Sequence, residues 1–144
     1  MRLLLAFDAF GPELDGPTAG AAIARGLAAA GLEPPDVAAP AEVGDARLRA
    51  AFALVIGEAV LDRGTLEGRL TGELAVRARQ AGVPCHAIAA SVRLDPFDGR
   101  ILDLQHMLQA GTVAELERAG RDLGELLRAE VLPGERRGRS ARER

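Results

Sequence analysis

Short apolar runs alternate along this chain with stretches in which apolar residues recur at helical spacing. The continuous apolar runs, bounded by charges or turn residues, predict strands at residues 3–7, 37–39, 52–57, 85–90 and 101–107. The helical stretches predict helices at residues 17–30, 45–51 and 65–82 and a final helix that begins at 112. Strands that alternate with helices predict an α/β fold: a three-layer Rossmann-like domain with a mainly parallel sheet of about five strands flanked by helices.

Cap and turn residues support several of these boundaries. Pro17 suits the first position of a helix, and Thr112 with Glu115 has the spacing of a capping box. Residues 95–99, Asp-Pro-Phe-Asp-Gly, predict a turn before the fifth strand.

The chain has 144 residues, which is the size of one ordinary domain. We expect that domain at residues 1–134. The segment 135–144 follows a Pro-Gly pair, lacks apolar periodicity and holds five Arg and two Glu, so we expect a disordered Arg-rich tail there.

Composition excludes several classes of chemistry. The chain has no lysine, which rules out a Schiff base and a P-loop lysine. It has no Trp or Tyr and only four Phe, so a base-stacking surface for nucleic acid is not expected. Its longest apolar run, residues 50–57, is too short to span a membrane, and Asp8 interrupts the apolar N-terminus. We therefore expect a cytoplasmic protein without membrane contact.

Candidate chemistry lies where the predicted strands end, because parallel sheets bind ligands beyond their carboxyl ends. Asp8, Glu58 and Asp62 fall at this edge and would suit a hydrated Mg²⁺ ion, although solvated or helix-capping carboxylates have the same spacing. His86 lies inside an apolar strand and is expected to be a hydrogen-bonded core residue, and a structural role is also favoured for His106.

Residues 52–69 read Phe-Ala-Leu-Val-Ile-Gly-Glu-Ala-Val-Leu-Asp-Arg-Gly-Thr-Leu-Glu-Gly-Arg. This segment resembles the glycerate kinase signature D-L-V-I-T-G-E-G-R-x-D-x-Q-T-x-x-G-K. The matching positions are Gly57, Glu58, Asp62, Thr65 and Gly68. Segments 3–11, 82–92 and 101–117 also resemble that family, so the resemblance covers most of residues 1–130 but lacks a large inserted domain of the family.

The resemblance implies a Rossmann-like domain that transfers the terminal phosphoryl group of ATP to glycerate. No cofactor would be needed for folding, whereas activity would need ATP and Mg²⁺. The metal would be held by Asp8 and Glu58, and Asp62 and Arg63 would be catalytic, Asp62 acting on the substrate hydroxyl and Arg63 supplying charge. The other implied cofactor-binding positions are Gly57, Thr65 and Gly68, beside Asp8 and Glu58.

Two cationic positions of the family are replaced here, by Gly11 and Val60. Phosphoryl transfer depends on positive charge around the migrating group, so their loss predicts a degenerate, catalytically inactive protein that acts as a binding or assembly module. The alternative is a minimal ATP-dependent glycerate kinase. We also expect a homodimer, because the missing domain would expose apolar surface. A nucleotide or a small organic acid is the possible ligand.

Overall fold

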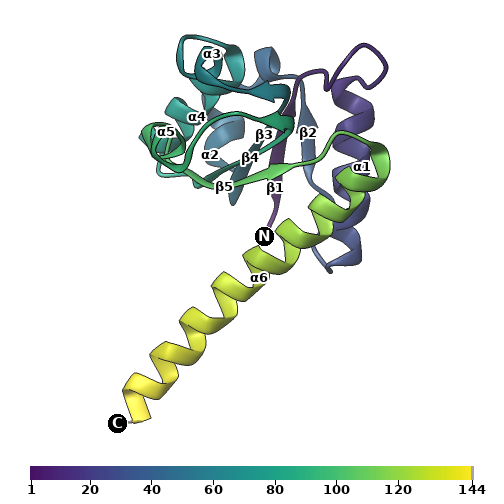
Figure 1. The fold of residues 1–144 in the computed structure, drawn as a ribbon. Helices are drawn as coiled ribbons and strands as arrows, with labels where there is room; N and C mark the ends of the chain where they lie inside the picture. Colours follow the sequence, from purple (N-terminus) through teal and green to yellow (C-terminus); the bar gives the residue numbers. More distant parts are fainter. Residues whose placement is uncertain (144) are drawn as a thin grey trace.

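In the computed structural model, five parallel strands form one sheet between two layers of helices (Figure 1). The backbone is described for residues 1–143 and the side chains for residues 1–131. The strands are β1 (Leu3–Phe7), β2 (Asp36–Ala38), β3 (Ala53–Leu61), β4 (Cys85–Val92) and β5 (Leu104–Gln109). The helices are α1 (Gly16–Ala29), α2 (Asp45–Arg49), α3 (Arg63–Leu66), α4 (Leu70–Gln80), α5 (Pro96–Ile101) and α6 (Val113–Glu143), with a short 3-10 helix at Pro40–Glu42.

The strands lie in the order β2-β1-β3-β4-β5, and every neighbouring pair is parallel. This confirms the predicted three-layer α/β fold. Because the chain adds β2 on one side of β1 and then crosses to β3 on the other, the direction of winding reverses between β1 and β3. The carboxyl ends of these two central strands therefore define the edge at which a ligand is expected.

Two apolar clusters, one on each face of the sheet, make up the core. The alternate residues of β1 divide between them: Leu3, Leu5 and Phe7 pack toward α1 and α6, and Leu4 and Ala6 pack toward α2 and α4. All five residues of β1 are buried, as the continuous apolar run predicts for a central strand.

Helices α1 and α6 approach each other closely because glycines line their contact. A Cβ atom at Gly26 would overlap the backbone carbonyl of Glu117, and one at Gly120 would overlap the carbonyl of Ile23. The buried apolar stripe of α6 continues the contact at Leu116, Leu123 and Leu127. This packing fixes α6 against the body, and Figure 1 shows that the helix then projects beyond it.

Several elements differ from the sequence-based prediction. Strand β3, expected at 52–57, continues to Leu61, so Glu58 lies within the strand rather than beyond its end. The expected helix at 65–82 is divided into α3 and α4, and between them Gly68 adopts a φ of +117° that favours glycine. Residues 95–99, expected to be a turn, begin helix α5, whose first turn is capped by the Asp95 carboxylate. Because α5 occupies these residues, β5 begins at Leu104 rather than at 101.

The predicted Arg-rich tail at 135–144 falls outside the residues whose side chains are described, and its disorder stays a prediction. Within the described part of the chain, no helix combines the length and apolarity needed to cross a bilayer.

Candidate functional site

The carboxyl half of β3 holds a buried carboxylate. The Glu58 side chain is only 7% exposed. Its Oε2 atom accepts hydrogen bonds from the hydroxyls of Thr65 (3.0 Å) and Thr71 (2.9 Å), and its Oε1 atom accepts one from Nη1 of Arg69 (2.9 Å). Together with Asp62, these residues are called the Glu58 cluster below.

Local sequence explains how the cluster forms. Asp62 follows β3 directly and caps α3. Its carboxylate accepts from the amide of Gly64, and the Thr65 hydroxyl accepts from the amide of Asp62. The turn at Gly68 then returns the chain, so that Arg69 and the first turn of α4 face the end of β3. The spacing from Glu58 to Thr71 thus encodes a strand, a cap, a short helix and a turn.

Arg69 joins the separate parts of the Glu58 cluster. Its Nη1 atom also donates to the carbonyl of Val60 (2.8 Å), and its Nη2 atom lies 2.9 Å from Oδ1 of Asp62. The hydrogen bond to Glu58 raises the pKa of Arg69 above its usual value, and the charges of both acids add to this effect. Both carboxylate oxygens of Glu58 are therefore engaged by donors from the protein itself.

Asp8 lies apart from this cluster. Its side chain is exposed and accepts a hydrogen bond from the amide of Ala9, while its backbone amide donates to the carbonyl of Gly57. Phe10 folds back against Phe7, with ring centroids 5.5 Å apart, and is 6% exposed. Among the described residues, no group of three or more acidic, His or Cys side chains could hold a metal ion.

The remaining predicted positions have separate local environments. Arg63 is exposed, and no hydrogen bond or ion pair links it to another described side chain. Gly57 lies against the ring of Phe7, which leaves no room for a Cβ atom there. A Cβ atom at Gly68 would meet open space, so the positive φ is the reason for glycine at this position. No observation tests a catalytic, metal-binding or cofactor-binding role for these residues.

Sequence reasoning did not identify Arg69 and Thr71 as partners of Glu58. A signal existed in the run Gly68-Arg69, because a glycine that ends a short helix reverses the chain and brings the following residues back to the strand. Nothing in the spacing showed which side chain would be aimed at Glu58.

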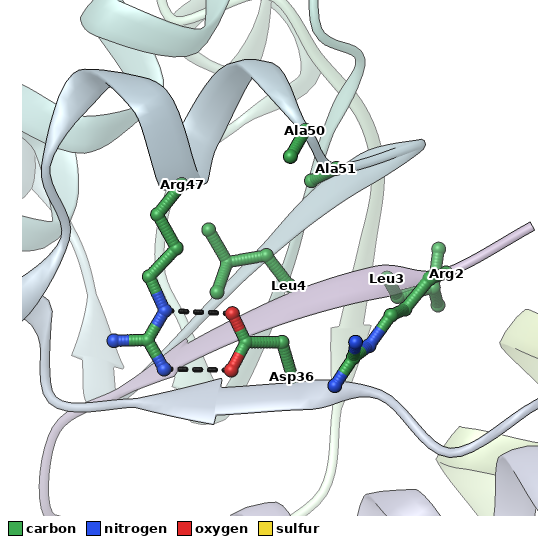
Figure 2. A pocket seen from close by; sticks show the side chains of 7 residues that line it. All are labelled: Arg2, Leu3, Leu4, Asp36, Arg47, Ala50 and Ala51. Carbon is green, nitrogen blue, oxygen red and sulfur yellow. Dashed lines mark hydrogen bonds and ion pairs between the residues drawn. The ribbon is translucent and has the colours of Figure 1, made fainter.

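Two hollows lie at opposite edges of the sheet. At the carboxyl edge, a groove of about 220 Å³ is mostly apolar and has one carboxylate; it is lined by Phe7, Pro17, Val37, Ala38, Ala39 and Glu42. At the amino edge, a hollow of about 140 Å³ is lined by Arg2, Leu3, Leu4, Asp36, Arg47, Ala50 and Ala51 (Figure 2).

The charges of the amino-edge hollow are largely engaged with each other. Figure 2 shows the guanidinium of Arg47 facing the carboxylate of Asp36, with two hydrogen bonds of 2.6 Å. The hydrogen bonds from Arg47 lower the pKa of Asp36. Ligands of parallel sheets bind at the carboxyl edge, whereas this hollow lies at the amino edge. We therefore interpret the pair of Asp36 and Arg47 as a structural ion pair and not as part of a substrate site.

The strand order, the parallel pairing and the two helical layers define a doubly wound α/β domain of the flavodoxin-like type. Solved structures agree. The chain is similar to a flavodoxin from the domain Archaea (15% identity, TM-score 0.57) and to the flavodoxin-like domain of a Synechococcus sp protein (16% identity, TM-score 0.57). In both cases the match covers 89% of this chain and 99% of the other.

It is also similar to a putative sugar binding protein from Salmonella typhimurium LT2 (18% identity, TM-score 0.53), over 95% of this chain and 39% of the other. No protein-family model and no curated protein sequence matches the chain. At these identities the neighbours show the fold.

The resemblance to glycerate kinases is wrong, because the structural neighbours are flavodoxin-like folds and no family model supports it. The matched positions instead have local structural roles. Asp62 and Thr65 form a helix cap, Glu58 is the centre of a hydrogen-bonded cluster, and the two glycines serve packing and a turn.

In flavodoxin this fold holds FMN at the β1/β3 edge, but the residues of this chain do not fit that group. The loop between β1 and α1 carries Asp8, Glu13 and Asp15 and no cation. The Asp15 carboxylate accepts a hydrogen bond from the amide of Thr18 at the start of α1. A phosphate bound there would need such backbone amides to be free. Neither Tyr nor Trp is present to stack on a flavin ring.

Proposed function

We propose that this protein is a non-catalytic assembly module that pairs with a second copy of itself along β5 and α5. The observation that carries the proposal is the contrast between the Glu58 cluster, whose charged groups are paired with one another, and an unprotected sheet edge. The acids and the arginine of the Glu58 cluster are bound to one another, so none of these groups is free to act as a base or a cation in turnover. Phosphorylation of glycerate, the alternative from the sequence, stays a prediction that this geometry does not favour.

A nucleotide or a small organic acid is also poorly matched to the carboxyl edge. Near β1 and β2 the described residues present the carboxylates of Asp8, Glu13 and Glu42, whereas beyond β3 Arg69 is bound to Glu58 and Arg63 is exposed. An anionic ligand beside β1 and β2 would meet like charge, and no observation places one at Arg63, so these ligands stay predictions as well.

The two edge strands of the sheet differ in their protection. β2 has three residues, includes Asp36 and follows Pro34 and Pro35, and each of these features discourages pairing with another chain. β5 has six residues, Leu-Gln-His-Met-Leu-Gln, with no acid, arginine or proline. None of the six is fully buried, and the strand pairs only with β4. The unpaired groups along β5 can therefore accept a further strand.

Helix α5 adds exposed apolar surface beside this edge. Phe97 is 69% exposed and Ile101 is 50% exposed, and the spacing of four residues places them on one side of the helix. Gly99 faces the body, where it packs against the end of the Met107 side chain on β5. β5 and these two side chains together form an exposed apolar surface, and its burial against a partner would be favourable.

The partner that best fits the β5 edge is a second copy of the same chain. Antiparallel pairing of β5 with its own copy forms a closed two-fold contact, in which every residue meets a residue of the same strand. A strand with acids or arginines would then bring like charges together, and β5, which has none, avoids that cost while His106 is neutral. The pairing would join two five-stranded sheets into one.

Sedimentation equilibrium at micromolar concentrations tests this proposal. We expect the natural chain to form a dimer, and we expect the double change Phe97→Asp and Ile101→Asp to weaken dimerisation at least tenfold, since it places like charges at a two-fold contact. Val76→Asp is the control, because Val76 is 43% exposed on α4 and lies outside the β5 edge. A natural chain that stays monomeric, or equal weakening by the control, would overturn the proposal.

A further inference from the structure

Two imidazoles and one carboxylate, each from a different element, lie in line across β4, β5 and α6. The Nδ1 atoms of His86 and His106 are 3.0 Å apart, and Nε2 of His106 lies 3.4 Å from Oε1 of Glu130. The ring planes are within 15° of parallel, with centroids 5.1 Å apart. His86 is 1% exposed, and its Nε2 atom has no partner among the described residues.

The register of β4 and β5 explains why the two rings meet. Cys85 pairs with Leu104 and Ala87 pairs with Met107, so β5 holds one more residue than β4 in this interval. His86 precedes Ile88 by two residues and so shares the face of Ile88, which packs in the same cluster as α6. Both imidazoles can then face the helix that carries Glu130.

The hydrogen bonds restrict the protons. A short contact between two Nδ1 atoms needs one donor and one acceptor. When both rings are neutral, the Nε2 proton of His106 lies on the side of Glu130 and its Nδ1 accepts from His86. When one proton is added, the proton between the rings moves to Nδ1 of His106, which then donates to the Nδ1 of His86 and keeps its second N–H toward Glu130, while the added proton lies on Nε2 of neutral His86. A single proton on the pair therefore keeps both contacts.

Burial determines which ring takes this proton. Desolvation, with a smaller effect of His106, lowers the pKa of His86 to about 4. The side chain of His106 is 25% exposed and faces a carboxylate. We propose that His86, His106 and Glu130 form a proton-dependent clip, in which protonated His106 holds α6 to edge strand β5 while buried His86 stays neutral as its acceptor.

Few other ionisable side chains in the described part bear on the clip. Arg128 of α6 donates to the carbonyl of Ala30, and on α1 Arg25 is paired with Glu117 of α6. Cys85 neighbours His86 but packs on the opposite face of the sheet, where burial raises the pKa of its thiol. Asp103 precedes β5 and acts on Cys85 by charge. The ion pair with Glu130 is therefore the contact that the proton changes.

The clip has two pH ranges with opposite effects. Protonation of His106 places a positive charge 3.4 Å from the Glu130 carboxylate and so forms an ion pair, which tightens the hold on α6. A second proton would have to enter buried His86 and would place two donors face to face. Since the folded-state pKa of His86 is below its ordinary value of 6.5, its contribution to stability is complete above 6.5 and is lost as the pH falls toward about 4.

NMR of the imidazole nitrogens between pH 8 and pH 4 tests the proposal in the full chain. We expect one ring to take up a proton while the other stays neutral until the pH is near 4. Amide exchange in α6 around Glu130, corrected for the intrinsic pH dependence, should slow about two- to fivefold as the first ring is protonated, which is the range for a partly exposed ion pair. Rings that titrate together would overturn the proposal.

Two variants separate the clip from a merely structural contact. Glu130→Gln should abolish the pH-dependent slowing, whereas Glu125→Gln, which removes an exposed partner of Arg121 on the same helix, should keep it. His86→Leu removes the acceptor of His106 and should reduce the slowing by at least half. If that variant does not fold, Glu130→Gln still decides, because unchanged slowing in it contradicts the clip. None of these readouts depends on the proposed self-association.

Discussion

Two buried polar groups of the same sheet have opposite surroundings. At the end of β3, both oxygens of the Glu58 carboxylate accept hydrogen bonds from the protein, three in all. On β4, His86 is still more deeply buried, but one of its nitrogens contacts His106 and the other has no partner among the described residues. The first group has at least one donor on each of its oxygens, and the second has one nitrogen without a partner among the described residues.

This difference separates stability from responsiveness. The Glu58 carboxylate cannot take up a proton without losing hydrogen bonds to its donors. Because those donors lie on α3, α4 and the turn between them, the Glu58 cluster holds this turn against β3. The histidine pair can hold zero or one extra proton with its contacts intact. A buried nitrogen without a hydrogen-bond partner lowers the stability of the folded protein. Such a cost is understandable at a site whose protonation state has to change.

The largest expected effect comes from Glu58→Leu. The change leaves the buried hydroxyls of Thr65 and Thr71 without their acceptor and removes the ion pair to Arg69. We expect the free energy of unfolding in urea to fall by about 3 kcal/mol, since each buried donor left unpaired costs about 1–3 kcal/mol. His86→Leu should cost less than half as much at pH 8, because it also removes an unsatisfied nitrogen.

Glu67→Gln is the matched control for this comparison. Glu67 is exposed at the end of α3 and makes no ion pair with a described side chain, so its neutralisation should change the free energy of unfolding by less than about 0.5 kcal/mol. Equal losses for Glu58→Leu and His86→Leu would show that the hydrogen bonding of the buried group does not distinguish the two sites.

An intermediate effect is expected for Thr71→Val. Thr71 is 3% exposed, and valine keeps its branched shape while removing one donor to Oε2 of Glu58. Thr65 and Arg69 still bind the carboxylate, so the free energy of unfolding should fall by about 1–2 kcal/mol. Urea titration measures the change, with the exposed substitution Val76→Thr on α4 as control. A loss below that of the control would mean that Thr71 contributes packing alone.

Most of the fold could be predicted because its signals are local. The continuous apolar run of β1 indicated a strand buried on both faces, and the spacing of Thr112 and Glu115 indicated a capping box, which the structure confirms with hydrogen bonds in both directions. The helix break at Gly68 and the helix at 96–101 were missed. In each of these cases one or two residues, a glycine with positive φ and a capping Asp95, decided between two plausible conformations.

The candidate sites were less predictable because they depend on contacts between distant segments. The pairing of His86 with His106 requires the irregular register between β4 and β5, which no spacing in the sequence reveals. The positions matched to glycerate kinases were real features of local geometry. These residues indicated a strand, a helix cap and a turn. The error was to interpret them as phosphoryl-transfer residues, because any protein with the same strand, cap and turn can have the same residues there.

The smallest expected effect is that of Asp62→Asn, inside the same cluster. Asparagine is as good a helix cap as aspartate, so the hydrogen bond to the amide of Gly64 can remain. Only the charge facing Arg69 is lost, and the two side chains are 32% and 43% exposed, so solvent screens their attraction. The free energy of unfolding, measured by urea titration, should fall by about 0.5 kcal/mol.

Asp62→Ala also removes the helix cap, so it should lower the free energy of unfolding by about 1 kcal/mol more. If Asp62→Asn instead costs as much as Thr71→Val, then the partly exposed charge contributes as much as a buried hydroxyl, and burial does not explain the order of effects within the Glu58 cluster.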